Sequence, residues 1–191
     1  MPLIPVLARM EFEGIGVNTV YLKELENDIS LKIEDLSKDI FTYAGHEFNI
    51  NYPQQLGIVL FEKIVLASKK KTKTGYATGS DILMEMIDHH PIVEKIILYR
   101  ELSKLKSTYI FALPKLVNPK TKRLHTCFNQ TGTATGRLSS SNPNLQNIPI
   151  RTETWRQIRK AFIPSRVSVD LVLAYYSQIV LRVLAHLAGE E

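Results

Sequence analysis

The stretch TATGRLSSSNPNLQNIPIR, residues 133–151, is rich in small hydroxyl and carboxamide side chains and poor in apolar ones. Pro143 and Pro149 disfavour a helix here, because proline lacks an amide donor and restricts the residue before it. We therefore expect an extended, turn-rich ribbon that presents Arg137, Asn144, Gln146 and Asn147. Arginine and carboxamide groups are suited to acceptor atoms on base edges and phosphates. Composition alone is also typical of a surface loop whose Asn and Ser side chains bond to its own backbone.

The ribbon resembles a signature of the family A DNA polymerases, the bacterial DNA polymerase I group. Further stretches are similar to that family in the same order: MPLIPVLARMEFEGIGVN (1–18), RELSKLKSTY (100–109), NPKTKRLHTCFNQTGTATGR (118–137), RQIRKAFIP (156–164) and YSQIVLRVLAHLAGEE (176–191). The resemblance spans nearly the whole chain and implies an α+β, mostly helical fold. It implies a helical thumb-like region at residues 1–122 and a partial palm at 123–191, which holds the ribbon and the first palm motif.

Charge is distributed unevenly along the 191 residues, although the net charge is only +5. Residues 1–62 hold 4 basic and 10 acidic side chains, whereas residues 63–166 hold 19 basic and 6 acidic ones. A basic surface of this density favours a polyanion, because each neutralised phosphate releases condensed counterions. A solvated lysine-rich face is the alternative that composition leaves open.

Other bulk features narrow the class of protein. A hydrophobic content of 45% is enough for a core, and the length indicates one domain, or one plus part of another. We expect no membrane-spanning helix, because no window of about 18 apolar residues is present. We expect no secretory signal, because the N-terminus lacks a basic lead followed by an apolar run and a small-residue cleavage site. The single Cys127 excludes an internal disulfide and fits a reducing compartment. The resemblance implies a cytoplasmic, nucleoid-associated protein.

Hydrophobic periodicity predicts several helices and two strands. A long helix is expected to begin after Asn18 as N-cap and to end at Gly45, with apolar residues every three or four positions. The other expected helices cover residues 2–12, 53–65, 80–87 (capped by Ser80), 91–113, 155–162 and 177–187, the last mostly buried. We expect a strand from Arg123 and a buried strand from Ser168.

Several cationic and hydroxyl side chains are candidates for DNA contact. Lys71 and Lys73 lie in a basic stretch that lacks apolar periodicity, which favours phosphate contact but also suits a plain linker. The resemblance places RELSKLKSTY against the primer–template duplex, whereas the residues alone would suit a solvated helix face. The DNA-binding set that it implies is Lys71, Lys73, Lys104, Lys106, Ser107, Thr108, Arg137, Asn144, Gln146, Asn147, Arg156 and Arg159.

The resemblance also implies a nucleotide site, of which this sequence holds only part. Arg151 would face the incoming triphosphate, Ser177 and Gln178 would lie beside it, and Tyr176 would offer its backbone carbonyl to a metal. The family uses magnesium, and hard divalent cations need carboxylate oxygens. Tyr175 stands at the family's aspartate position, and Val180 stands at the family's glutamate position. A phenol stays neutral near pH 7, so we expect no intact catalytic carboxylate and no magnesium bound by this chain.

These features predict a fragment of a DNA-directed DNA polymerase that binds primer–template or duplex DNA without sequence preference and does not polymerise alone. One alternative is a non-catalytic duplex-DNA-binding accessory module. Another is one half of a split polymerase, in which a separate chain supplies the fingers and the remaining palm. Zinc is not expected, because the histidines show no zinc-ligand spacing with Cys127.

Overall fold

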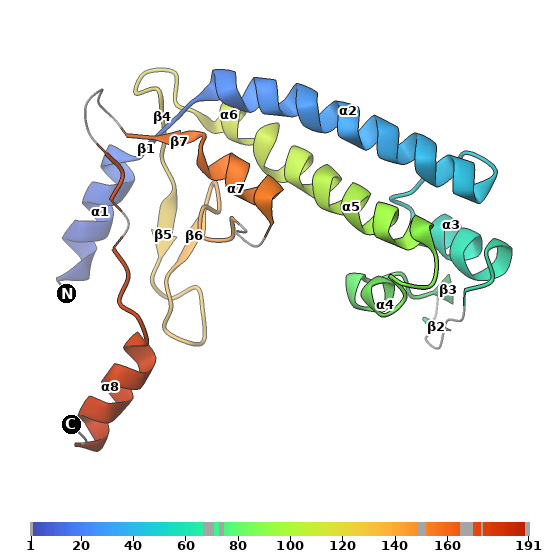
Figure 1. Ribbon diagram of the computed structural model, residues 1–191. Helices are drawn as coiled ribbons and strands as arrows, with labels where there is room; N and C mark the ends of the chain where they lie inside the picture. The colour runs from blue at the N-terminus through green and yellow to red at the C-terminus, as the bar shows by residue number, and fades with distance from the viewer. Residues whose placement is uncertain are drawn as a thin grey trace.

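A computed structural model of the chain describes residues 2–66, 71–72, 75–148, 152–164, 170–172 and 174–189. Short strands alternate with helices, and the two longest helices dominate the picture (Figure 1). In chain order the elements are α1 (Leu3–Glu13), β1 (Ile15–Val17), α2 (Thr19–Ala44), α3 (Pro53–Ile58), η1 (Val59–Lys63), β2 (Lys71–Thr72), β3 (Gly75–Tyr76), α4 (Ser80–Glu85), α5 (Pro91–Leu105), η2 (Lys106–Ile110), α6 (Leu113–Leu116), β4 (Arg123–Leu124), β5 (Cys127–Asn129), β6 (Ser139–Ser141), α7 (Glu153–Arg159), β7 (Phe162–Ile163) and α8 (Ile179–Ala188).

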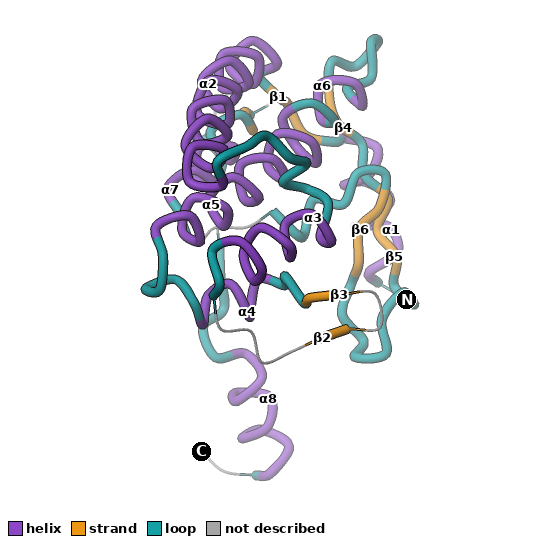
Figure 2. Tube along the Cα trace, turned by 90° about the vertical axis from the view of Figure 1, so that its right-hand side faces the viewer, coloured by secondary structure: helices purple, strands orange, loops and turns teal. Residues whose placement is uncertain are grey.

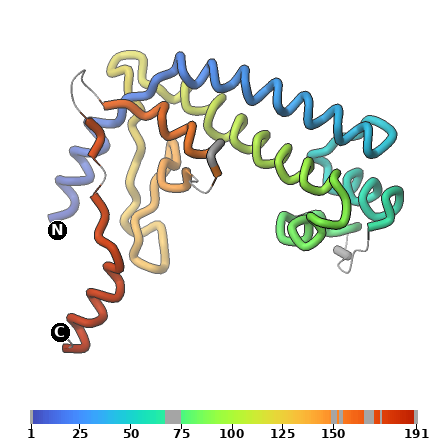
Figure 3. Tube along the Cα trace, in the orientation of Figure 1, coloured from blue at the N-terminus to red at the C-terminus, as the bar shows by residue number. Residues whose placement is uncertain are grey.

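Helix α2 begins and ends where the sequence predicts. The Asn18 side chain accepts a hydrogen bond of 3.0 Å from the Tyr21 amide, which satisfies one of the first-turn donors. Gly45 ends the helix in the left-handed conformation, with φ 75°, and its amide donates to the Phe41 carbonyl at 2.9 Å. Helix α5 packs along α2 in the opposite direction, so the pair forms a long arm (Figure 3).

Two hydrophobic cores lie at opposite ends of this arm. The base core joins α2, α5 and η2 to β1, β4 and α7, and its buried residues are Val17, Leu22, Leu25, Ile29, Leu102, Leu105, Tyr109, Ile110, Leu113, Leu124, Trp155, Ile158 and Ala161. The tip core joins α2 and α5 to α3, η1 and α4, with Leu56, Leu60, Leu83, Ile92 and Ile96 among its fully buried residues. The apolar stripe of α2 contributes to both cores: its first half packs into the base core and its second half into the tip core. The arm therefore connects the two cores.

Three small antiparallel sheets complete the fold. The base sheet has the order β4-β1-β7, with Ile15 opposite Leu124 and Val17 opposite Phe162. The β5–β6 hairpin descends from this sheet, and the small β2–β3 hairpin lies at the tip of the arm (Figures 1 and 2). The expected strand from Arg123 is therefore divided, because β4 pairs with β1 whereas β5 pairs with β6.

Three of the expected helices differ in detail from the sequence pattern. The helices predicted at 53–65 and 91–113 each contain a π-helical turn, η1 and η2, before they end. The N-cap of α4 is Gly79 rather than the expected Ser80, and no side chain caps this helix.

The prediction of a buried strand from Ser168 is wrong for the residues that the structure describes. Residues 170–172 and 174–176 form no strand, and Val172 and Tyr175 are each 87% exposed. The prediction that the following helix is mostly buried is wrong as well, since none of the residues of α8 is buried. Both segments are apolar enough for a core, but no described element packs over them. Their apolar side chains therefore remain exposed.

Candidate nucleic-acid interface

The ribbon folds as the β5–β6 hairpin followed by tight turns. Cys127, Phe128 and Asn129 lie opposite Ser141, Ser140 and Ser139, which fixes the hairpin register. Residues 130–138 form the connecting loop, whose described backbone shows turns and bends. The Thr133 hydroxyl donates to the Arg137 carbonyl at 2.7 Å and narrows this loop. The side chain of Arg137 is exposed.

Ser140 organises the turn that carries the carboxamides. Its side chain is buried and donates to Asn144 Oδ1 at 3.2 Å, while its oxygen accepts from the amides of Leu145 (3.1 Å) and Gln146 (3.2 Å). One hydroxyl thus uses its donor and both acceptor sites within six residues. Asn144 and Gln146 remain exposed while the backbone beneath them is fixed.

A second hydroxyl ties the ends of the hairpin together. Thr126 is buried just before β5, and its Oγ1 lies 3.1 Å from the Ser141 carbonyl and 2.7 Å from the Pro143 carbonyl. A single hydroxyl proton serves these two acceptors, because a threonine has one donor. The ribbon is therefore held by buried side-chain bonds rather than by a long strand ladder.

Tyr109 connects the ribbon to the arm. The phenol of this buried η2 residue donates to the Asn147 carbonyl at 2.7 Å, and its ring meets the Trp155 ring edge-to-face with centroids 5.7 Å apart. Burial raises the pKa of Tyr109, which keeps the phenol protonated as a donor. Through these two contacts of Tyr109, η2, the ribbon and α7 meet at one place. The side chain of Asn147 is exposed there.

The elements that meet there also carry cationic side chains. On α7, Trp155 and Ile158 are buried, whereas Arg156 and Arg159 are exposed, as expected for residues on opposite faces of a helix. On α5 and η2, the exposed or half-buried candidates are Lys104, Lys106, Ser107 and Thr108. An acidic side chain nearby, Glu101, accepts from the Thr152 hydroxyl at 2.7 Å. The arrangement combines donors for base edges with cations for phosphates.

Comparison with known proteins identifies the family. Residues 19–191 match DNA polymerase family A. DNA polymerase I of Geobacillus stearothermophilus is 52% identical over 190 residues, which is 100% of this chain and 22% of the relative. The thermostable DNA polymerase I of Thermus aquaticus is 53% identical over 192 residues and is covered to 23%. This chain belongs to DNA polymerase family A.

A solved structure of the family shares the fold. The polymerase domain of Pol1 from M. smegmatis, in complex with DNA primer-template and dNTP, superposes with a TM-score of 0.81 at 39% identity. The match covers 97% of this chain and 35% of that one. The α+β, mostly helical class expected for a fragment of a polymerase domain is thereby confirmed. This chain spans little more than a fifth of the length of the DNA polymerase I relatives named above.

The remaining family positions lie apart from this interface or outside the described residues. The backbone of Lys71 is in β2, at the tip of the arm, and Lys73 and Arg151 lie outside the described residues. Tyr176, Ser177 and Gln178 are exposed before α8, which Figures 1 and 2 place away from α5 and α7. The structure does not bring these nucleotide-site candidates together with the ribbon.

The described residues do not fit a magnesium site. They contain no group of three or more His, Cys, Asp or Glu side chains that could hold a metal ion. At the two positions where the sequence resemblance implies family carboxylates, Tyr175 offers an exposed phenol and the side chain of Val180 has no oxygen. Among the same residues, no helix has the length and the apolar character needed to cross a bilayer.

Ser140, Thr126 and Tyr109 were not among the predicted site residues, although they hold the ribbon in place. A run of three serines carries no signal for which hydroxyl is buried, and Tyr109 reads in the sequence as one more member of an apolar stripe. Only the pairing of β5 with β6 and the position of η2 show their roles.

Proposed function

We propose that this chain holds primer–template DNA as part of a family A DNA polymerase and does so without sequence preference. One observation carries the proposal: exposed Asn144, Gln146 and Asn147 stand on a backbone that buried Ser140 and Tyr109 fix. Exposed Arg137 lies in the loop of the same ribbon, where its carbonyl accepts from the Thr133 hydroxyl. Pre-ordered donors lose little conformational entropy on binding. The related Pol1 domain of known structure is a complex with primer-template and dNTP, which supports the same ligand class here.

The side chains suit duplex geometry rather than a particular sequence. Arg137 would donate into the minor groove, where the acceptors of the four base pairs are nearly equivalent, so it would test pairing geometry. Exposed Arg156 and Arg159 would neutralise phosphates, with Lys104 and Lys106 adding to the same field. Contacts of this kind give register and affinity but carry no sequence information.

We also propose that the isolated chain does not add nucleotides. The family resemblance implies in-line phosphoryl transfer with two metal ions, and the described residues bring together no group of three or more His, Cys, Asp or Glu side chains that could hold one. A radiolabelled primer-extension assay with purified chain and magnesium tests this directly. Incorporation of nucleotides above a heat-treated control would contradict it.

Fluorescence anisotropy with a labelled primer–template tests the DNA-binding proposal. The affinity should fall log-linearly with salt concentration, and Arg137→Ala should weaken binding about tenfold. Arg9→Ala is the control, since it removes another exposed arginine, from α1, and should change the affinity far less. Absence of binding at low salt, or an equal effect of the two variants, would overturn the proposal.

One observation favours the alternative in which this chain is one half of a split polymerase and associates with a separate chain that supplies the fingers and the remaining palm. Helix α8 exposes Leu181, Val183, Leu184 and Leu187, all at least half exposed. Apolar patches of this kind mark interaction sites. Native mass spectrometry with a chain that carries the fingers and remaining palm of a relative should detect a one-to-one complex. Failure to assemble at micromolar concentration would count against it.

A further inference from the structure

Helix α1 binds the outer edge of the hairpin that carries Arg137. The carboxylate of Glu11 accepts a hydrogen bond of 2.5 Å from the Phe128 amide in the middle of β5. This amide lies opposite Ser140 in the ladder, yet it is directed to α1. The side chain of Glu11 is half-buried, which strengthens a charge-assisted bond relative to an exposed one.

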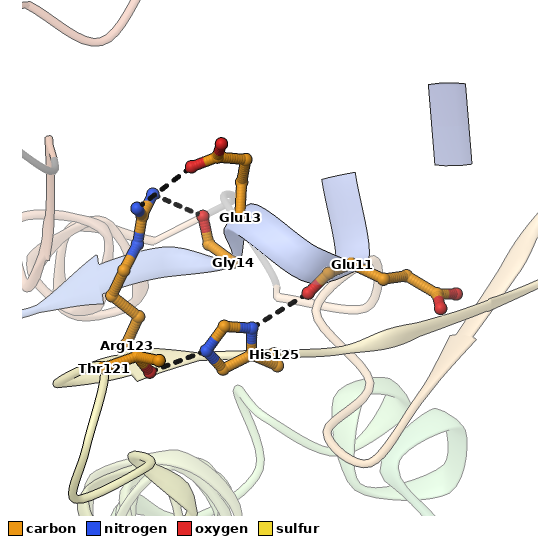
Figure 4. A network of polar contacts seen from close by, with 6 residues as sticks. All are labelled: Glu11, Glu13, Gly14, Thr121, Arg123 and His125. Atoms are coloured by element: carbon orange, nitrogen blue, oxygen red, sulfur yellow. Dashed lines mark hydrogen bonds and ion pairs between the residues drawn. The ribbon is translucent and has the colours of Figure 1, made fainter. Parts of the chain in front are cut away.

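The backbone of Glu11 is used as well. Its carbonyl accepts from His125 Nδ1 at 2.8 Å, so Nδ1 carries the proton, and His125 Nε2 lies 2.7 Å from the Thr121 hydroxyl (Figure 4). A single residue of α1 therefore binds the chain before β5 through its backbone and β5 itself through its side chain.

The end of α1 is fixed to the base sheet by other groups. Arg123 donates to the Gly14 carbonyl at 2.9 Å and pairs with Glu13 at 3.3 Å (Figure 4). Gly14 has φ 61°, and a side chain there would collide with the Leu124 carbonyl, so the helix end lies directly against β4. Because the end of α1 is fixed to the base sheet, the hydrogen bond between Glu11 and the Phe128 amide also fixes β5 relative to that sheet.

The hairpin needs such support. A two-stranded ribbon is at best marginally stable in water, and β5–β6 has only three residue pairs. Arg137 is in the loop at the far end, where a small rotation at β5 becomes a larger displacement of the guanidinium. The contact between Glu11 and Phe128 resists this rotation from the edge of β5 that does not face β6.

We propose that Glu11 is a positioning residue for the DNA contact of Arg137. This inference rests on the proposed function, since Arg137 must contact DNA for its position to matter. Glu11 does not itself contact the nucleic acid. Its role requires an acceptor oxygen at the length of a glutamate side chain; the negative charge strengthens the bond but is not what positions the hairpin.

Two variants separate the acceptor from the charge. Glu11→Gln keeps an amide oxygen for the Phe128 amide, whereas Glu11→Met matches the length but offers no comparable acceptor. Both remove the same charge, so any general electrostatic change in DNA affinity is equal in the two. We expect Glu11→Met to bind primer–template about three- to tenfold more weakly than Glu11→Gln, since part of the Arg137 contribution is lost.

Amide hydrogen exchange of Phe128, followed by NMR, reports the clamp independently of DNA. Exchange should accelerate about tenfold or more in Glu11→Met and clearly less in Glu11→Gln, which keeps an acceptor for the amide although without the charge. Thermal unfolding of both variants controls for loss of the fold. If Glu11→Met does not fold, Glu11→Ala provides the second acceptor-free variant.

A double-variant cycle decides the mechanism. In an Arg137→Ala background, exchanging Glu11→Gln for Glu11→Met should change the DNA affinity less than twofold, because the group being positioned is gone. An unchanged ratio between the two backgrounds would overturn the inference and leave the proposed function intact. Absence of DNA binding by the wild-type chain would overturn both, whereas equal affinities of Glu11→Gln and Glu11→Met would overturn this inference alone.

Discussion

The phenol of Tyr109 donates a 2.7 Å hydrogen bond to the backbone carbonyl of Asn147 and so joins the π-helical end of the arm to the ribbon. We expect Tyr109→Phe to lower the free energy of unfolding by about 0.5–1.5 kcal/mol, the net value of one buried hydrogen bond. The Trp155 contact survives in this variant, because the ring is kept. Urea unfolding followed by tryptophan fluorescence measures the change, and anisotropy with primer–template should show a parallel loss of affinity.

Tyr99→Phe is the control for this variant. The Tyr99 hydroxyl accepts from the Asn51 side chain at 3.2 Å at the tip of the same arm, so the chemical change is equal but distant from the ribbon. We expect its DNA affinity to match the wild type. A loss equal to that of Tyr109→Phe would mean that the hydroxyl at the ribbon has no special role in binding.

The pH dependence of stability should carry the signature of Tyr109. Burial raises the pKa of this phenol in the folded state above its ordinary value of about 10, so the folded protein holds the proton more tightly than the unfolded chain. Its contribution is complete below about pH 10 and is lost as the pH rises from there through the folded-state pKa. The stability difference between wild type and Tyr109→Phe should therefore shrink above about pH 10. Parallel urea titrations at pH 8, 9, 10 and 11 test this, and a constant difference would contradict it.

The parts of the fold that follow local rules were predictable from the sequence. Asn18 and Gly45 mark the ends of α2 because a cap and a left-handed C-terminus depend on residues within one turn. The ribbon was predicted as extended and turn-rich for the same reason, since proline acts on its neighbours. Burial of a periodic apolar segment depends on what lies across from it, which explains why α8 was misjudged.

The candidate site was predictable in its exposed residues and not in its supports. Arg137 and the carboxamides were singled out by side-chain chemistry and by the family resemblance, and the structure leaves them exposed. Glu11 acts through a contact with Phe128, 117 positions away, and a pattern of neighbours cannot show such a pairing. Ser140 bonds to residues four to six positions away, but a run of three serines does not show which hydroxyl is buried.

Lys106 should contribute to the salt dependence of DNA binding. It is half-buried at the start of η2, beside the residues that meet the ribbon, and a lysine on a phosphate releases about one counterion. Lys106→Ala should reduce the slope of log affinity against log salt by about one and weaken all sequences alike. Lys38→Ala is the control, because Lys38 is exposed on α2 and pairs with Glu34 at 2.8 Å. Equal slopes for Lys106→Ala and wild type would remove Lys106 from the interface.

Two leucines that each lie in a helix with regularly spaced apolar residues should differ sharply in how much their replacement by alanine lowers stability. Leu105 is fully buried in the base core, whereas Leu184 on α8 is 59% exposed. Leu105→Ala should lower the free energy of unfolding by about 2–5 kcal/mol, because it removes apolar contacts and leaves a cavity. Leu184→Ala should change it by less than about 0.5 kcal/mol in the isolated chain, since the side chain has little packing to lose. Urea unfolding of both variants at equal protein concentration measures the contrast.

A cost above 1 kcal/mol for Leu184→Ala would show that α8 is packed in solution, either within the chain or between copies. Repeating the measurement over a tenfold range of protein concentration separates these two cases, because only packing between copies varies with concentration.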